Sequence, residues 1–235
     1  MFRSLILLTF WSIATSLAAL ALFPYTLLTG HVDTLYWTAM KIARGGLKLV
    51  GVRVQLLGLE NLDLSRAYIY MCNHVSNLDP PVVIGWLPQR TSVMAKRELF
   101  RIPILGRAMR MASVVPIDRG KKDAAITSVR AAADVLRSGL SMVVFPEGTR
   151  SPDGRLLPFK KGPFYMATET DAPIVPVTVL HTDKMLPKGG FRLRSGTASV
   201  VFHAPITPSS FATREALMEA VRASIASSLP IEGNH

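Results

Sequence analysis

The sequence has very little cysteine and comparatively little negative charge. Cys72 is the only cysteine among 235 residues, which excludes a disulfide framework and any zinc or iron–sulfur site built on several thiolates. Sixteen Asp and Glu oppose 27 Lys and Arg, so the formal net charge is +11. Because 49% of the residues are hydrophobic and the 16 Gly and 16 Pro follow no period, disordered and collagen-like chains are excluded. We therefore expect one folded domain with an appendage, in a reducing compartment.

Charge is also missing from a long stretch near the N-terminus. Residues 4–30 contain no Asp, Glu, Lys or Arg, and residues 5–28 are dominated by Leu, Ile, Ala and Phe. About 20 apolar helical residues match a hydrocarbon core of roughly 30 Å. A cleaved signal peptide, with residues 19–21 as its small-residue site, and a buried core helix are the alternatives. The run exceeds the usual signal-peptide length of about 7–15 apolar residues and is apolar on all sides, so we favour a retained membrane anchor.

A basic amphipathic segment follows. Lys41, Arg44 and Lys48 recur at spacings of three and four with apolar residues between them, and Tyr36 and Trp37 suit the headgroup boundary. The pattern predicts an interfacial helix, and a basic surface helix of a globular domain is the alternative. If the first segment spans the bilayer, these cations place the following chain on the cytoplasmic face, at the inner membrane in a bacterium. A hairpin dipped into one leaflet is equally compatible with the sequence.

From about residue 52, short apolar runs alternate with amphipathic ones. This pattern predicts an α/β fold with a mixed sheet flanked by helices. We expect a membrane-anchoring helical segment over residues 1–50 and one domain over residues 51–235. The expected strands lie at residues 52–57, 67–72, 91–95, 113–116, 141–145, 174–179 and 197–202. The expected helices lie at residues 80–86, 101–109, 122–138, 163–170 and 214–228.

The loop after the second expected strand carries a histidine and an aspartate. His74 and Asp79 are five residues apart, which on one helix would separate them by about 140°, so they meet only if the chain turns between them. Ser76 and Asn77 favour a turn, and Pro80 can begin a helix that has Asp79 as its N-cap. A carboxylate there can accept a hydrogen bond from imidazole Nδ1–H and make Nε2 a better base. The alternative is a helix cap beside a satisfied polar histidine.

A second polar loop, Phe-Pro-Glu-Gly-Thr-Arg-Ser at residues 145–151, directly follows an expected strand. Gly148 lets the backbone approach an anion closely, and the Arg150 guanidinium offers a planar set of donors for phosphate. Thr149 adds a hydroxyl and a backbone N–H. The alternative is a polar turn with a solvated arginine.

Between the two loops, residues 90–122 hold nine basic and two acidic residues, which supply +7 of the net charge. Few aromatic residues interleave these charges and no nucleic-acid recognition motif is present, so nucleic acid is the least favoured partner. An anionic lipid headgroup together with a phosphorylated substrate accounts for both the charge and the anchor.

These motifs, in this order, resemble those of the glycerolipid acyltransferase family, and within it the lysophosphatidic acid acyltransferases. The family's Asn-His and Asp, separated by four residues, stand at residues 73–79. Val-Pro-Ile-Asp-Arg at 115–119 matches the second motif, although the family often has Phe-Ile before its arginine segment. The third motif is complete at 145–151, with Phe-Lys-Lys-Gly following at 159–162, and the fourth is Ile-Val-Pro-Val at 174–177. The resemblance covers about residues 52–205.

The resemblance implies an acyltransferase domain over residues 51–235. Such a domain would move an acyl chain from acyl-CoA or acyl-carrier protein to the sn-2 hydroxyl of 1-acylglycerol-3-phosphate, giving phosphatidic acid. No metal or cofactor is implied beyond that co-substrate. His74 would be the general base and Asp79 its partner. Substrate-binding residues implied by the resemblance, with Arg150 as the phosphate clamp, are Lys96, Arg119, Glu147, Gly148, Thr149 and Arg150.

Several alternatives stay open on the sequence. Cys72, two residues before His74, could form a Cys/His pair, but it closes an apolar strand and is expected to be a buried thiol. No Gly-x-Ser-x-Gly motif is present, so direct attack of the acceptor oxygen on the thioester is favoured over an acyl-enzyme. The competing functions are acylation of another lysolipid, hydrolysis of a phospholipid by water activated at His74, and non-catalytic binding to an anionic membrane.

Overall fold

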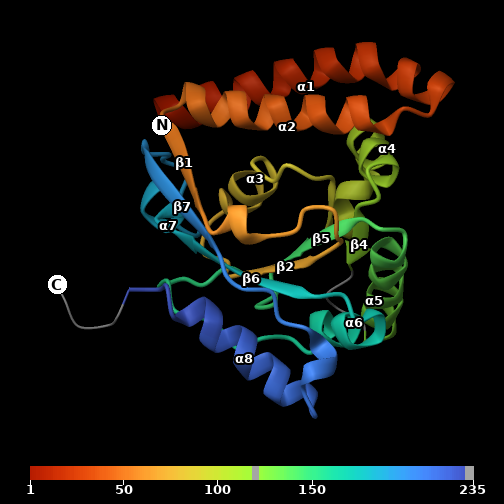
Figure 1. The fold of residues 1–235 in the computed structure, drawn as a ribbon. Helices are drawn as coiled ribbons and strands as arrows, with labels where there is room; N and C mark the ends of the chain where they lie inside the picture. The colour runs from red at the N-terminus through yellow and green to blue at the C-terminus, as the bar shows by residue number, and fades with distance from the viewer. Residues whose placement is uncertain (118–121, 231–235) are drawn as a thin grey trace.

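A seven-stranded mixed sheet forms the centre of the protein (Figure 1). The structure, a computed structural model, describes residues 1–117 and 122–230, with the side chains of 103, 104 and 122–126 excepted. The strand order is β1-β7-β6-β2-β5-β3-β4. The strands β6, β2, β5, β3 and β4 are parallel, and β7 pairs antiparallel with β6 and parallel with β1. The bounds are β1 Val52–Leu57, β2 Ile69–Cys72, β3 Thr91–Lys96, β4 Val115–Ile117, β5 Ser141–Val144, β6 Ile174–Leu180 and β7 Gly196–Phe202.

All seven expected strands form, with small shifts at their ends, and the mixed α/β class is confirmed. The central strands β2 and β5 are buried at every residue, as is nearly all of β6. A parallel strand covered by helices on both faces needs apolar residues on both faces, which is why these strands read as uninterrupted Val, Ile and Met runs.

Helices cover both faces of the sheet (Figure 1). One core cluster contains side chains of α1, α2 and α3, and the other contains side chains of α5, α6 and α8. The helix α7 was not expected, because four residues are too few to show a helical period. The bounds are α1 Phe2–Thr29, α2 Val32–Leu49, α3 Asp79–Ile84, α4 Pro103–Met111, α5 Lys122–Arg137, α6 Gly162–Thr170, α7 Thr182–Met185 and α8 Arg214–Ala226, with 3-10 turns at Leu59–Asn61, Arg97–Arg101 and Pro208–Ser210.

The first two helices form a hairpin that lies along one side of the molecule (Figure 1). Gly30, at a φ of 73°, ends α1 in the left-handed region that favours glycine. The helices approach closely at Gly46, where a Cβ would lie 2.2 Å from the indole nitrogen of Trp11. The helix α2 is bound to the domain through buried Leu47 and through Tyr36, whose hydroxyl lies 3.0 Å from Oγ1 of Thr91.

Among the described residues, α1 is the one helix long and apolar enough to cross a membrane, judged by length and composition. The mean hydropathy of its most apolar window is 2.1, and only 6% of that window is buried inside the protein. This exposure contradicts the buried-core alternative, because a core helix would be covered by protein. The interfacial helix predicted over α2 stays a prediction, but the placing of Tyr36 at the headgroup boundary is wrong. Its side chain is 6% exposed and its hydroxyl is hydrogen-bonded to Thr91 inside the domain.

The sheet topology decides where the motif loops meet. The strands β6, β2 and β5 are neighbours and parallel, so their carboxyl ends lie at one edge of the sheet. The loops that follow β2 and β5 carry the first and third motifs. Ligands of open α/β sheets bind at such an edge, which places the candidate site there.

Candidate active site

The first loop begins with an asparagine that prolongs the sheet. Asn73 is 1% exposed, and its side-chain Nδ2 donates to the carbonyl of Val179 at 3.0 Å. The backbone N–H of Val179 donates to Oδ1 of Asn73 at 2.7 Å. The amide side chain thus replaces one rung of the β2–β6 ladder. It fixes the backbone directly before His74.

His74 and Asp79 meet as the turn chemistry predicts. Nδ1 of His74 lies 2.8 Å from Oδ2 of Asp79, whose side chain is fully buried. The same oxygen accepts the backbone N–H groups of Val75 and Ser76, at 2.7 and 2.8 Å. The ring of His74 keeps 15% of its surface exposed and lies against the ring of Phe145, with 4.3 Å between centroids. A buried acceptor thus fixes one ring nitrogen while the histidine still reaches solvent.

The predicted cap role of Asp79 is wrong. The N-cap of α3 is Leu78, and Asp79 is the first residue of the helix. Its carboxylate is directed backwards, to the turn amides and the imidazole, and not onward to the first helical N–H groups. Two backbone donors, a ring donor and a hydroxyl donor satisfy a buried carboxylate better than one helical amide would.

The hydroxyl donor comes from Thr182, which the sequence analysis missed. Oγ1 of Thr182 donates to Oδ1 of Asp79 at 2.5 Å, and both side chains are fully buried. Thr182 begins α7, 103 residues along the chain from Asp79. Its only sequence signal is its position shortly after the fourth motif, because no local pattern marks a contact over such a separation.

Glu147 joins the third-motif loop to the first loop. Its Oε1 accepts the backbone N–H of His74 at 2.7 Å, and Oε2 accepts that of Leu157 at 3.0 Å. The backbone N–H of Ser151 donates to the carbonyl of His74 at 2.7 Å. Glu147 is 2% exposed, and this burial raises the pKa of its carboxyl group. The third-motif loop therefore holds the backbone of His74 on both sides.

The third-motif loop turns tightly before Arg150. Gly148 has a φ of 71°, a left-handed conformation, and its N–H donates to the carbonyl of Phe145 at 3.0 Å. Thr149 is exposed, and Arg150 is half-buried. The carbonyl of Arg150 accepts from Nζ of Lys188 at 2.7 Å. Among the described residues, the guanidinium of Arg150 has no hydrogen-bond or ion-pair partner, so its donors are available to an anion.

Lys96 and Arg119 are the other two cations predicted to bind the substrate. Lys96 is the last residue of β3 and is exposed. The pairing of Val93 with Val143 sets β3 parallel to β5, so Lys96 ends at the same sheet edge as the third-motif loop. Within the part of the chain that the structure describes, no hydrogen bond or ion pair joins Lys96 to that loop. Arg119 lies outside the described residues.

Cys72 is an inert core thiol. It is fully buried at the end of β2. Burial, with a smaller contribution from Asp79, raises the pKa of its thiol well above the ordinary value. Since the thiolate is the nucleophilic form, this position does not suit covalent catalysis.

Comparison with known proteins identifies the family of this chain. Residues 53–180 match the family model described as Acyltransferase. A 1-acyl-sn-glycerol-3-phosphate acyltransferase of Limnanthes alba is 36% identical over 198 residues, which cover 83% of this chain and 68% of that protein. The chloroplastic BAT2 enzyme of the same name from Brassica napus is 39% identical over 66% of this chain, which spans 45% of that protein's length.

A solved structure matches almost the whole fold. It is the crystal structure of the 1-acyl-sn-glycerophosphate (LPA) acyltransferase PlsC from Thermotoga maritima, with a TM-score of 0.79 and 26% sequence identity. The match covers 96% of this chain and 95% of that one. The family model takes in both site loops and more than half of the residues, and so this chain belongs to the acyltransferase family.

Proposed function

We propose that this chain is a membrane-bound 1-acylglycerol-3-phosphate O-acyltransferase. It transfers an acyl chain from acyl-CoA or acyl-carrier protein to the sn-2 hydroxyl of lysophosphatidate and so makes phosphatidic acid. The observation that carries the proposal is the pair of partly exposed His74 and buried Asp79, hydrogen-bonded into one unit with the loop that presents Arg150. The acceptor is supported by the names of the relatives and of the matched structure, and acylation of that acceptor gives phosphatidic acid.

The chemistry follows from the atoms at hand. Asp79 holds the proton on Nδ1 of His74, which leaves Nε2 to take the proton of the acceptor hydroxyl. The acceptor oxygen attacks the thioester carbonyl, and a tetrahedral oxyanion forms. When the intermediate collapses, the carbon–sulfur bond breaks and the leaving thiolate takes the proton from Nε2. General-base catalysis contributes about 10²–10⁴-fold, so alignment of the two substrates supplies much of the remaining rate.

The phosphate of the acceptor is assigned to Arg150. A guanidinium without a protein partner offers paired donors that fit phosphate oxygens. Lys96, at the end of β3, adds positive charge at the same edge of the sheet. The resemblance to the family assigns Arg119 to the phosphate as well. We assign Glu147 and Gly148 to shaping the loop, since the carboxylate is engaged by two backbone amides and the glycine permits the turn.

Arg150→Ala tests the phosphate assignment. We expect KM for lysophosphatidate to rise about 10–100-fold, because a charge-assisted hydrogen bond contributes about 1.5–3 kcal/mol. Use of monoacylglycerol, which has no phosphate, changes little. Steady-state thioester consumption with each acceptor measures both values, and Arg66→Ala, in an exposed turn before β2, is the matched control. Equal losses with the two acceptors would contradict a phosphate role.

The reaction class is tested with purified protein and labelled acyl-CoA. We expect thioester to be consumed only when lysophosphatidate is present, with label recovered in phosphatidic acid. Release of labelled fatty acid without acceptor would instead support the hydrolase alternative.

Thr182 is proposed as a positioning residue that acts through Asp79. Thr182→Val keeps the side-chain shape but removes the hydroxyl, so we expect kcat to fall about tenfold with both KM values unchanged. Thr182→Ser restores the donor and most of the rate. Thr178→Val is the matched control, because Thr178 is also fully buried, yet its hydroxyl bonds His203 and Ile225 away from the site. Equal rates in the Val and Ser variants would refute the assignment.

Membrane attachment is assigned to α1. Its exposed apolar surface and the basic residues of α2 support a protein held at the bilayer, with the catalytic domain on the cytoplasmic face. The lysolipid acceptor resides in that bilayer, so attachment brings the site to its substrate.

A further inference from the structure

The segment between α7 and β7, residues 186–195, contacts both loops of the site. Oγ of Ser76, in the His74 loop, donates to the carbonyl of Leu186 at 2.7 Å. Nζ of Lys188 donates to the carbonyl of Arg150, also at 2.7 Å. The beginning of this segment is therefore fixed to both loops of the proposed active site.

The end of the same segment contacts the start of α1. Oγ of Ser4 donates to the carbonyl of Phe191 and accepts the backbone N–H of Leu193 at 2.9 Å. The backbone N–H of Arg194 donates to the carbonyl of Met185 at 2.9 Å. Leu193 and Met185 are buried in the same core cluster as side chains of α1 and α2. The segment is thus a fixed bridge from the site loops to the apolar helix.

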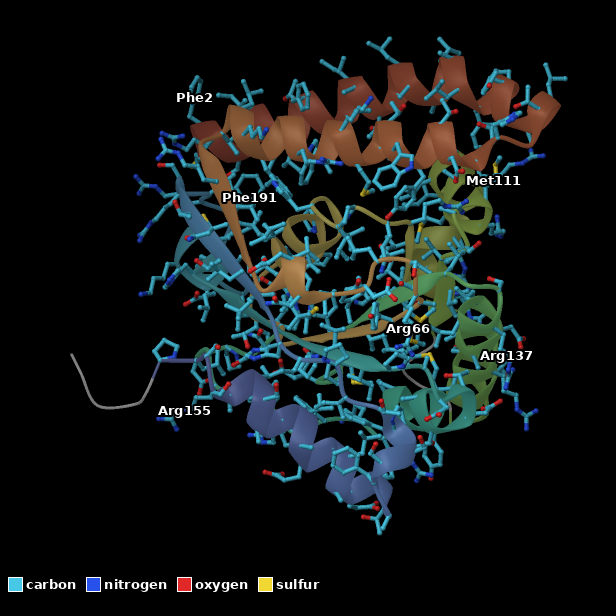
Figure 2. All side chains as sticks on the ribbon, in the orientation of Figure 1. Phe2, Arg66, Met111, Arg137, Arg155 and Phe191 are labelled. Carbon is cyan, nitrogen blue, oxygen red and sulfur yellow. The ribbon has the colours of Figure 1, made fainter. Side chains whose placement is uncertain are left out.

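The outer surface of this bridge combines an aromatic side chain with positive charge. Phe191 is 59% exposed, and Phe2, beside Ser4 at the start of α1, is 78% exposed. Figure 2 shows Phe2 and Phe191 at the same end of the molecule. Residues 184–195 contain no Asp or Glu. The exposed basic residues in that range are Lys184, Lys188, Arg192 and Arg194.

This combination fits the surface of an anionic bilayer. An aromatic ring gains by entering the boundary between headgroups and acyl chains, while arginine and lysine stay with the phosphates. The surface is continuous with α1, whose exposed large apolar side chains begin with Phe2 and Leu5. That continuity favours lipid over an acidic protein partner, because a partner protein seated there would have to share the surface with the membrane helix.

We propose that residues 186–195 form a second membrane contact, in which Phe191 and the neighbouring cations seat on an anionic bilayer beside the start of α1. The proposal rests on the proposed function in one respect, since it needs α1 to reach the bilayer. It adds a direct connection between the bilayer surface and the loops of His74 and Arg150. Seating the bridge holds the two site loops close to the bilayer surface, where a lysolipid headgroup lies.

The single buried cysteine makes a direct test possible. Because Cys72 is fully buried, Phe191→Cys adds one accessible thiol for a polarity-sensitive fluorophore. The full chain is bound to vesicles that contain phosphatidylglycerol and recovered by flotation. We expect a blue shift of the label and quenching by spin-labelled lipid. The same label at Arg66→Cys, in the exposed turn before β2, is the control and stays in water.

A second arm tests the charge. Each cation near an anionic surface strengthens binding about fivefold, so Arg192→Glu with Arg194→Glu in the labelled chain returns the fluorophore to water. Phosphatidylcholine vesicles give a weaker shift than phosphatidylglycerol vesicles. A label at position 191 that stays aqueous in floated protein overturns the proposal, as does a shift that the two glutamates leave unchanged. Thioester consumption in detergent micelles tests the acyltransferase function separately, because it needs no bilayer contact.

Discussion

His74→Ala is expected to lower kcat for lysophosphatidate about 10²–10⁴-fold, the contribution of a positioned general base. The loss should not arise from unfolding. The imidazole is partly exposed, and without it Oδ2 of Asp79 still accepts two backbone N–H groups. Thioester consumption measures kcat, and circular dichroism with vesicle flotation checks that fold and membrane binding are retained.

His31→Ala is the matched control for this change. His31 lies in the exposed turn between α1 and α2, far along the chain from the site loops, so its loss should leave kcat unchanged. If His74→Ala turned over at the wild-type rate, the acceptor proton would have to leave by another route and the base assignment would fall.

Asp79→Asn is expected to lower kcat by a similar factor, about 10²–10⁴, while preserving the geometry. The N–H groups of Val75 and Ser76 require an acceptor at the Oδ2 position, so they orient the amide oxygen toward themselves and His74. The amide nitrogen then faces the hydroxyl of Thr182, which can accept. What disappears is the negative charge beside the imidazolium of the transition state, and the expected loss of rate corresponds to about 3–5 kcal/mol of activation free energy.

Thermal unfolding and kcat together separate charge from structure in this variant. We expect a midpoint close to that of the wild type and a large loss of rate. Asp63→Asn is the control, since the Asp63 carboxylate accepts hydrogen bonds from Ser65 in an exposed turn outside the site. A wild-type rate in Asp79→Asn would show that the charge plays no part in turnover.

Local sequence patterns predicted much of the fold. The uninterrupted apolar runs of β2, β5 and β6 identified strands because both of their faces are covered. Helix ends were less well predicted. The helix expected at residues 80–86 begins at Asp79 and ends at Ile84, because the geometry of the adjoining turns sets its ends. The order of strands across the sheet is not written in any local pattern, and it alone brings the β2 and β5 loops together.

Some residues of the site could likewise be predicted from local sequence, and others could not. His74, Asp79 and Arg150 stand in short motifs whose spacing already indicates chemistry. Thr182 could not be found by such reasoning, because its hydroxyl reaches Asp79 only after β6 has crossed the sheet. The role of Asn73 was likewise hidden, since an asparagine that substitutes for a rung of a sheet looks like any loop residue until its partner strand is known.

The strand order also determines when contacts can form during synthesis of the chain. Within the described residues β1 pairs with β7 alone, whose residues are made about 140 positions later, and Thr182 follows almost the whole set of parallel strands. A ribosome therefore releases α1 and α2 long before β1 acquires a neighbour or Asp79 its hydroxyl donor. The emerging polypeptide can therefore reach a membrane before its sheet and its buried carboxylate are complete.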